Sequence, residues 1–580
     1  MWVRRHTLFT LVFLFVVTAG MMIGAMREES ATIDETVFLG AGYSYWLGHR
    51  YRLEPPNPPL AQLLAAFPLT MIGPKLPPRG DAMIRGHAMA ETTERWDMWD
   101  ANSAPVRAVD LFPHGPNFYH FPFYEGIYFG ENLVYGGQND AEKLIFWGRI
   151  PEVLLTLVAG LMVFLWARRM QGDAAGLLAA SMFLLNPVIL GYGHIVQTDI
   201  GMAVTFPLAI WMFVRLVETP GTCRAVYAGL AAGVALAIKH SAVILAPTFL
   251  VVWLLYRLRH RGAEPIGWKR WITVAAVAWG VILLLYAPYW TPPPPIDEAT
   301  VARLGVPDWF VRLRPILIPA EYFKGLALVL LHVSGGHDAY LNGAWSHVGW
   351  WYYFPLAFAM KTPLPFLVFA GAGVTLAVRS RRELQFGELA AWASAAVYLP
   401  CAMRSKADLG LRYLLVLYPL VSVASACALS QWTEHVLEAR RKLARWAVAA
   451  LPVTGLAVAM MAYPFFICYM NPLAGGPEHG HEHLLDSNFD WGQDAIRLKK
   501  FLDERGIRDI YLDYFGTQAA IDYYGILNQR VDGEAARQIQ QGWLVVSAQR
   551  LMRPEWQWLR ESQRPVARVA YTLFVYRMGN

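Results

Sequence analysis

The chain is built from long apolar blocks separated by short polar stretches. Eleven such blocks run over 8–26, 145–167, 174–190, 201–217, 226–238, 241–256, 271–289, 363–378, 387–402, 411–429 and 445–463. Most approach the ~20 residues that a helix needs to cross about 30 Å of hydrocarbon. Only 16% of the 580 residues are charged, whereas a soluble chain carries about 25%. The pattern predicts a mainly α, polytopic helical membrane protein with about eleven transmembrane helices.

The first block follows a basic start, in MWVRRHTLFTLVFLFVVTAGMMIGAM. Signal peptides share this pattern. The apolar core is long for a signal peptide, however, and no small-x-small cleavage motif clearly follows it. We therefore expect an uncleaved first transmembrane helix.

Basic residues in the short loops predict the orientation, because such residues favour the cytoplasmic side of a membrane. If the eleven blocks alternate, one side collects Arg4 and Arg5, Arg168 and Arg169, RLRHRG from Arg257, RSRR from Arg379 and ARRKLAR from Ala439. The N-terminus is then cytoplasmic and the C-terminus extracytoplasmic.

Three segments face outward in this topology. Residues 27–144 and 290–362 are outer loops of a transmembrane part that spans 1–463. The first loop contains LEPPNPPLAQLLAAFPL, which predicts a helix along the membrane interface. Residues 464–580 form the third segment and alternate helical with strand-like patterns. They comprise a helix over WGQDAIRLKKFLDERG ended by Gly506, strands over IRDIYLDYFG, GWLVVSAQ and ARVAYTLFVYR, and a helix near PEWQWLRESQ. We expect a small soluble α/β extracytoplasmic domain.

Composition also limits which classes of molecule the protein is expected to bind. The net charge of +6 is modest and the basic clusters lie between apolar blocks, so we expect membrane lipid and no nucleic acid as a partner. The four cysteines lie in or beside apolar blocks without paired spacing. They predict neither a disulfide framework nor a zinc knuckle.

Three acids lie on the predicted outer side. Asp34 and Glu35 directly follow the first block, where a solvated loop is the plain interpretation and a general base is the alternative. Asp199 lies in GYGHIVQTDIG. Either Thr198 or Asp199 caps the next helix, or Asp199 is a further acid on the surface that carries Asp34.

Basic residues also lie on this outer side, where the positive-inside tendency disfavours them. They are Arg149 in GRIPEVLL, Lys239 in a tight turn, and Arg404, Lys406 and Arg412 in RSKADLGLRYLL. Arg can hold a phosphate by bidentate hydrogen bonds and Lys by its point charge. Anchoring to lipid headgroups explains them equally well.

The run EHGHEH contains His479, His481 and His483, which suit a metal by ligand type. Short His-rich loops are also commonly just solvated.

The placement of the ionisable residues discriminates between classes of membrane protein. Transporters place ionisable residues and broken helices near mid-membrane. Here the apolar blocks contain almost no ionisable residues, and the polar residues gather at the predicted outer helix ends. This distribution favours a reaction at the outer face of the membrane.

Longer motifs carry a resemblance over nearly the whole chain. DETVFLGAGYSYWLGHRYRLEPPNPPLAQLLAAFPL opens with an Asp-Glu pair and continues to a His-Pro-Pro-Leu type motif, and GRIPEVLL through IVQTD covers two further blocks. GWWYYFPLAFAMKTPLP, LGLRYLLVLYPL and DSNFDWGQD follow. With these motifs the chain resembles a GT-C class membrane glycosyltransferase. It is similar to bacterial relatives of the protein O-mannosyltransferases (glycosyltransferase family 39) and of the lipid A aminoarabinose transferase.

The resemblance implies a polyprenyl-phosphate-linked sugar donor, a hexose or a pentose, and a place in the bacterial inner membrane with the C-terminal domain in the periplasm. The acceptor would be a protein, an envelope glycan or a lipid. Asp34 would be the catalytic base with Glu35 beside it, and Asp199 the second acid. Arg149 would engage the lipid phosphate, with Lys239 and Arg412 behind it.

One position departs from the family. The His or Lys that often precedes the two prolines is Asn57 here, and Asn57 can hydrogen-bond a phosphate or hydroxyl but brings no charge. Members of the class differ in metal dependence, so no cofactor is certain and a divalent metal stays open. A direct displacement would invert the sugar's anomeric configuration. A transporter or flippase of lipid-linked sugars and a non-catalytic scaffold are the alternatives.

Overall fold

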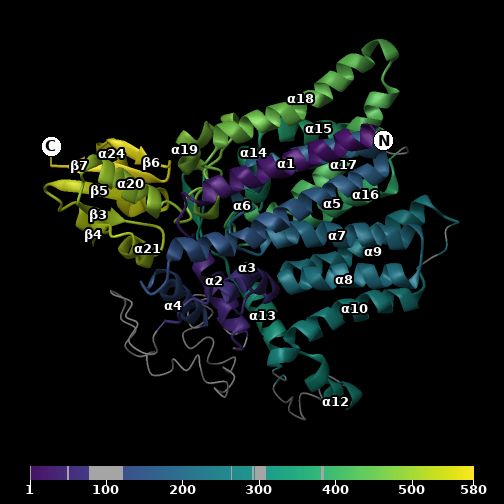
Figure 1. Cartoon of the computed structure of the whole chain (residues 1–580), viewed down its shortest axis with the longest axis horizontal. Helices are drawn as coiled ribbons and strands as arrows, with labels where there is room; N and C mark the ends of the chain where they lie inside the picture. The colour runs from purple at the N-terminus through teal and green to yellow at the C-terminus, as the bar shows by residue number, and fades with distance from the viewer. Residues whose placement is uncertain are drawn as a thin grey trace.

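Long helices run side by side in a bundle, and a small sheet lies at one end of it (Figure 1). This computed structural model describes residues 2–48, 51, 53–77, 122–262, 264, 266–290, 293, 308–379 and 384–579. The proline tract at 292–295 and the RSRR run from Arg379 lie mostly outside the described residues.

In the described residues of the N-terminal half, the regular secondary structure is helical. Its elements are α1 (Trp2–Met26), α2 (Ile33–Trp46), α3 (Leu60–Ile72), α4 (Pro122–Tyr135), α5 (Ala141–Leu184), α6 (Pro187–Tyr192), α7 (Asp199–Glu218), α8 (Thr222–Ile238), the 3-10 helix η3 (His240–Ile244), α9 (Leu245–Arg259), α10 (Trp268–Tyr286) and η4 (Ala287–Tyr289).

Helix α5 contains two helices that fold back on each other. The backbone breaks at Gln171 and at Gly172, where φ is 80°, a conformation that glycine adopts without strain. The two halves then pack closely. A Cβ on Gly160 would lie 2.6 Å from Leu184, and one on Gly176 would lie 2.8 Å from the carbonyl oxygen of Phe164. The apolar blocks 145–167 and 174–190 therefore form an antiparallel hairpin.

The bundle continues with further helices and one two-stranded ribbon. They are α12 (Asp308–Leu317), α13 (Ala320–Gly335), β1 (Ala339–Leu341), β2 (Ala344–Ser346), α14 (Tyr353–Lys361), α15 (Leu364–Arg379), α16 (Phe386–Ala402), η5 (Leu411–Leu414), α17 (Leu417–His435) and α18 (Glu438–Ala462). The largest apolar core lies between α5, α7, α16 and α17.

The prediction of about eleven spanning helices is confirmed only in part. Every apolar block forms a helix, but in the described residues six helices are long and apolar enough to cross a membrane, or seven if the pair α12 and α13, bent by 85°, counts as one span. Helices α8, α15 and α16 have 17, 16 and 17 residues, fewer than the ~20 that a straight crossing needs. The protein is a multi-pass, mainly helical membrane protein.

The chain ends in a mixed sheet with short helices. The strands β3 (Asp509–Asp513), β4 (Leu527–Arg530), β5 (Gly542–Ser547), β6 (Ala567–Val569) and β7 (Leu573–Met578) lie in the order β4-β3-β5-β7-β6. The helices and 3-10 helices of this segment are η6 (Pro472–Ala474), α19 (Gly476–His483), η7 (Asp486–Asn488), α20 (Ala495–Arg505), α21 (Gln518–Tyr523), α22 (Gly533–Ala536), α23 (Ala548–Leu551), η8 (Pro554–Trp556) and α24 (Gln557–Ser562). Strands β4, β3 and β5 are parallel, and β7 is antiparallel to both its neighbours.

Two details of this segment differ from the prediction. The stretch ARVAYTLFVYR forms two strands, because Ala570 and Tyr571 both adopt positive φ and turn the chain back. Strand β4 was not expected, since LNQR lacks the β-branched and aromatic residues that mark strands. The predicted helix ending at Gly506 is confirmed, with Gly506 in the left-handed conformation.

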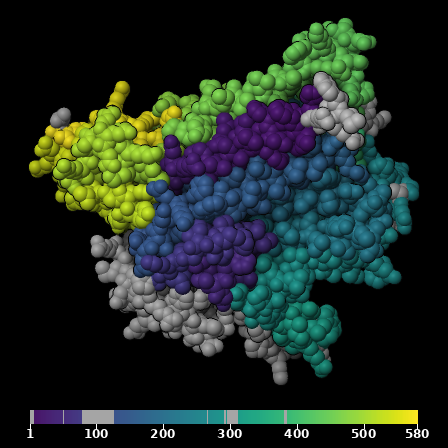
Figure 2. All heavy atoms as spheres, viewed as in Figure 1, coloured from purple at the N-terminus to yellow at the C-terminus, as the bar shows by residue number. Residues whose placement is uncertain are grey.

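The bundle has two chemically different ends. At one end Thr7 bonds to Asp173, Arg168 pairs with Asp173, and Gln385 bonds to the carbonyl oxygen of Met170, so several basic loops meet there. At the other end the C-terminal residues form a lobe against the bundle (Figure 2). This separation agrees with the predicted sidedness, which stays a prediction.

The sidedness is testable with single cysteines. Exposed Cys223 and Cys401 are first changed to serine, and Glu264→Cys or Gln538→Cys is then added at exposed positions. A membrane-impermeant maleimide should label Gln538→Cys in spheroplasts and Glu264→Cys only in inverted vesicles, because the two loops lie on opposite sides. Labelling of both positions from one side would contradict the topology.

Candidate active site

The first turn of α2 carries the two adjacent acids, and the Glu35 carboxylate accepts hydrogen bonds from backbone amides. Its Oε2 accepts a hydrogen bond from the Thr32 amide at 2.8 Å, and its Oε1 accepts one from the Val196 amide at 3.0 Å. An acid three residues after Thr that bonds back to the Thr amide is half of a capping box. The sequence TIDE contains that signature, so this role of Glu35 had a signal in the sequence.

Arg149 pairs with Glu35 where neither side chain reaches solvent. Its Nε and Nη2 donate to the Glu35 carboxylate at 2.8 and 2.7 Å. Its remaining N–H groups donate to the carbonyl oxygens of Met26, Glu29 and Ser30. A guanidinium has five N–H donors, and all five are used. This arrangement leaves Arg149 no N–H for a ligand phosphate.

Asp34 points to a different arginine. Its Oδ2 accepts from Arg412 Nη1 at 2.8 Å, and the Asp34 side chain keeps 25% of its exposure. The Arg412 guanidinium lies over the ring of Trp491, 4.5 Å from its centroid. Its Nε is buried without a hydrogen-bond partner among the described residues. Arg412 therefore has an N–H group without a partner among the described residues, whereas every N–H group of Arg149 is already used.

A second ion pair adjoins the first. Asp199, the first residue of α7, accepts from Lys239 Nζ at 2.5 Å, and Thr198 occupies the cap position. The Lys239 ammonium and the Arg412 guanidinium both contact the ring of Tyr413, at 4.6 and 5.4 Å from its centroid. Burial lowers the pKa of Lys239, and Asp199 opposes that shift. The structure thus brings Asp34, Asp199, Lys239 and Arg412 together.

The C-terminal segment also reaches this group. Asp486 adopts a positive φ of 55°, which is strained for a residue other than glycine and is common at functional sites. Burial raises the pKa of Asp486; Arg412 lowers that pKa and Asp34 raises it. The charges of Arg412 and Asp34 therefore both act on the Asp486 carboxyl. Asp486 and Trp491 lie in the motif DSNFDWGQD, but nothing in their spacing places them beside residues 34 and 412.

Asn57 makes its contact within its own loop. Its Nδ2 donates to Glu54 Oε1 at 2.7 Å. Glu54 is buried, and its Oε2 has no partner in the described part of the chain. Burial raises the pKa of Glu54 to about 8, Asn57 opposes the shift, and Asp34 adds to it. Asn57 thus supports a second buried acid near Asp34.

The other predicted residues lie apart from this group. Arg404 and Lys406 are exposed. His479 pairs with Glu482, His483 contacts Asn342, and His481 is buried against Phe574. The described residues contain no group of three or more His, Cys, Asp or Glu side chains placed to hold a metal ion.

Residues 141–289 match the sequence profile of the family described as dolichyl-phosphate-mannose-protein mannosyltransferase. The matched segment begins with α5 and includes Arg149, Asp199 and Lys239. For this segment the resemblance to the protein mannosyltransferases is confirmed. None of the curated protein sequences compared with the chain matches it.

Solved structures of other proteins are similar at low identity. The crystal structure of ArnT from Cupriavidus metallidurans bound to undecaprenyl phosphate has 14% identity and a TM-score of 0.46, covering 98% of this chain and 97% of that one. The archaeal oligosaccharyltransferase AglB from Archaeoglobus fulgidus, in complex with an inhibitory peptide and a dolichol-phosphate, has 15% identity and a TM-score of 0.39, covering 75% and 63%.

Removing Arg149 should destabilise the end of the bundle that contains the loop before α2. Arg149→Ala leaves Glu35 buried and unpaired, which costs about 3–5 kcal/mol. The matched control is Arg168→Ala on the same helix, whose pair with Asp173 is partly exposed and is worth only about 0–1 kcal/mol. Thermal unfolding in detergent should separate the two variants. Equal melting temperatures would show that the buried pair is not needed for stability.

Glu54 should make stability depend on pH. Between its ordinary pKa of 4.5 and the raised value of about 8, the unfolded chain releases the proton while the folded chain keeps it, so the free energy of unfolding falls as pH rises. Glu54→Gln cannot ionise, so its stability relative to the wild type should grow from about pH 5 to about pH 9. Melting curves at several pH values test this, with exposed Glu534→Gln as control. A constant difference would exclude the shift.

Proposed function

We propose that this protein is a membrane glycosyltransferase that moves a sugar from a polyprenyl-phosphate donor to an acceptor hydroxyl. The observation that carries the proposal is the pair of Asp34 and Arg412. A partly exposed carboxylate lies beside a cation whose Nε–H has no partner within the described chain. A base and an anion-binding group are thus adjacent, as glycosyl transfer from a phosphate requires.

Asp34 is the base in this proposal. An alcohol is not ionised at neutral pH, so the attacking hydroxyl must lose its proton as it bonds to the anomeric carbon. A positioned carboxylate that takes this proton contributes about 10²–10⁴-fold in rate. Asp34 is the better placed of the two adjacent acids, because both Glu35 oxygens are occupied by Arg149 and by backbone amides.

Arg412 and Lys239 stabilise the departing polyprenyl phosphate. Negative charge develops on the phosphate as the bond to the sugar breaks, and cations in a site without water stabilise it strongly. Arg412 keeps one contact to Asp34 and offers its remaining donors to the phosphate, so one guanidinium would set base and leaving group relative to each other. Asp199 holds Lys239 in place. Arg149 is assigned a structural role instead.

The reaction is a direct displacement that inverts the anomeric configuration. The donor's lipid would lie between helices, with its phosphate at the end of the bundle that bears the C-terminal sheet. The match of residues 141–289 to a family named for a dolichyl-phosphate-sugar donor supports this donor class. The acceptor is a protein, an envelope glycan or a lipid, and residues 464–580 lie on the periplasmic side of a bacterial inner membrane.

Replacing the base tests the proposal. Asp34→Asn keeps the shape and a hydrogen bond to Arg412 but cannot take a proton. We expect transfer from a polyprenyl-phosphate sugar to fall about 10²–10⁴-fold, with an unchanged elution profile and melting temperature. Radiolabelled sugar transfer by purified protein measures this. Full activity of Asp34→Asn would exclude Asp34 as the base.

The same preparation separates an enzyme from a transporter. Proteoliposomes with donor sealed inside should transfer sugar only where the active end of the protein meets the donor. Movement of intact donor across the bilayer, with no transfer to any hydroxyl, would support a flippase instead.

A further inference from the structure

A chain of buried charges joins the C-terminal unit to the bundle. Arg497 Nη1, on the first turn of α20, contacts Asp494 Oδ1 at 2.5 Å, and its Nη2 lies 3.7 Å from Glu29 Oε1. Glu29 Oε2 lies 2.8 Å from His194 Nε2. Acidic and basic side chains alternate along Asp494, Arg497, Glu29 and His194, and each of them is nearly excluded from solvent.

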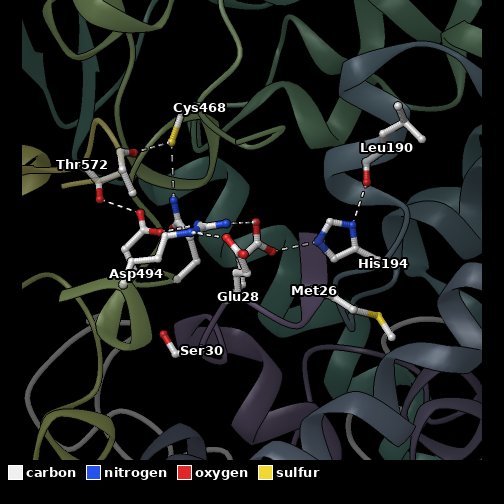
Figure 3. A network of polar contacts seen from close by, with 12 residues as sticks. Met26, Glu28, Ser30, Leu190, His194, Cys468, Asp494 and Thr572 are labelled. Atoms are coloured by element: carbon white, nitrogen blue, oxygen red, sulfur yellow. Dashed lines mark hydrogen bonds and ion pairs between the residues drawn. The ribbon is translucent and has the colours of Figure 1, made fainter. Parts of the chain in front are cut away.

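The two ends of this chain attach to different parts of the molecule. Thr572, just before β7, donates to Asp494 at 2.6 Å. The His194 Nδ1 lies 2.7 Å from the Leu190 carbonyl oxygen in α6. Both ring nitrogens of His194 are therefore engaged, one by the Glu29 carboxylate and one by the backbone of α6. Glu28 adjoins the network, with its Oε2 3.8 Å from Arg497 Nε. Figure 3 shows Asp494 and Thr572 on one side of the network, His194 and Leu190 on the other, and Glu28 between them.

The loop that contains Glu29 leads directly to Asp34, the proposed base. Glu29 lies in the loop between α1 and α2, five residues before Asp34. The Ser30 amide donates to the Gln493 carbonyl at 2.9 Å, and the Ile33 amide donates to the Trp491 carbonyl at 3.3 Å. The C-terminal segment therefore holds the backbone that immediately precedes Asp34.

The same segment holds the loop of Arg412. The Leu411 amide donates to Asn488 Oδ1 at 2.8 Å, and the Ser487 hydroxyl donates to the Leu409 carbonyl at 2.9 Å. Residues 487–495 thus fix the backbones on both sides of the Asp34–Arg412 pair.

Arg497 is what allows the C-terminal unit to dock against this loop. Burial raises the pKa of Asp494, Arg497 lowers it and Glu29 adds to the rise, so the two carboxylates repel each other across the guanidinium. Without Arg497 two buried carboxylates face each other with reduced compensation, which is costly in a site of low dielectric constant. The contact between this loop and the C-terminal unit would then loosen, because the repulsion between the carboxylates acts against the backbone hydrogen bonds that join the two segments.

We propose that Arg497 is a positioning residue for the transfer reaction, through which the C-terminal unit holds Asp34 and Arg412 in their reactive arrangement; this rests on the function proposed above. A displacement of about 1 Å at reacting groups can cost about 10²-fold in rate. The C-terminal unit then acts on the chemical step rather than on donor binding.

The experiment uses the full chain in nanodiscs and three variants. Arg497→Met removes the charge and keeps the length, Arg497→Lys keeps the charge, and Arg505→Met is the control at an exposed arginine on the same helix. We expect kcat of Arg497→Met to fall about 10²-fold, with the donor KM within about twofold. Arg497→Lys should recover most of the rate, and Arg505→Met should match the wild type.

Hydrogen exchange supplies a readout that needs no activity. Amides in residues 29–36 should exchange faster in Arg497→Met, while those of the α5 hairpin keep their wild-type rates. Glu29→Gln, which removes the attraction from the other side, should give the same exchange pattern if Arg497→Met does not accumulate.

The outcomes separate the two proposals. Faster exchange confined to 29–36 in a protein that never transfers sugar, wild type included, would show that Arg497 holds this segment in place and would overturn the proposed function. Wild-type kcat in Arg497→Met would overturn the positioning role, as would unchanged exchange in residues 29–36. Faster exchange throughout the bundle would also overturn it, since Arg497 would then serve global stability only.

Discussion

Arg149 and Glu35 meet without access to water at the end of the bundle near the C-terminal lobe, and the loop before α2 is assembled around them. A buried ion pair is stabilising only if further hydrogen bonds offset the desolvation of both charges. Here the guanidinium also binds three carbonyl oxygens and the carboxylate two amides. The pair therefore fixes residues 26–35 and directs the neighbouring Asp34 out toward Arg412.

Residues of the same type thereby take different roles in this region. The two arginines differ in how many of their N–H groups are already used within the protein. Asp34 and Glu35 are adjacent in the chain, and Arg149 and Arg412 look alike by sequence. Only the structure shows that Arg149 has no N–H left and that Arg412 has a buried one unused. Residue type and predicted sidedness grouped Asp34, Asp199, Lys239 and Arg412, and the structure brings these four side chains together. The family resemblance put Arg149 ahead of Arg412 for the phosphate, and the sequence could not reveal that every N–H of Arg149 is used, because hydrogen-bond satisfaction is a tertiary property.

The fold was predictable where local physics decides it. Apolar length located α1, α7 and α10, and Gly506 located the end of α20. The reversal inside α5 depends on a single glycine at 172 and on close packing of the two halves. The turn at Ala570 and Tyr571 contains neither Gly nor Asn, the residues that would have indicated positive φ in the sequence. These features are set by packing partners distant in sequence, so periodicity alone could not reveal them.

The boundary expected at residue 464 follows composition, whereas packing places part of the C-terminal segment with the membrane bundle. Buried Lys361 donates to the carbonyl oxygens of Ile467, Tyr469 and Asn488, and Asn471 donates to those of Ala359 and Thr362. A segment anchored in this way transmits the position of the sheet to α2 and η5. Three stretches far apart in sequence, around residues 34, 412 and 490, must then dock together before Asp34 and Arg412 can pair. The polar composition of residues 464–580 therefore reflects a surface on one side only, and their other side packs against the end of the bundle that carries Asp34 and Arg412.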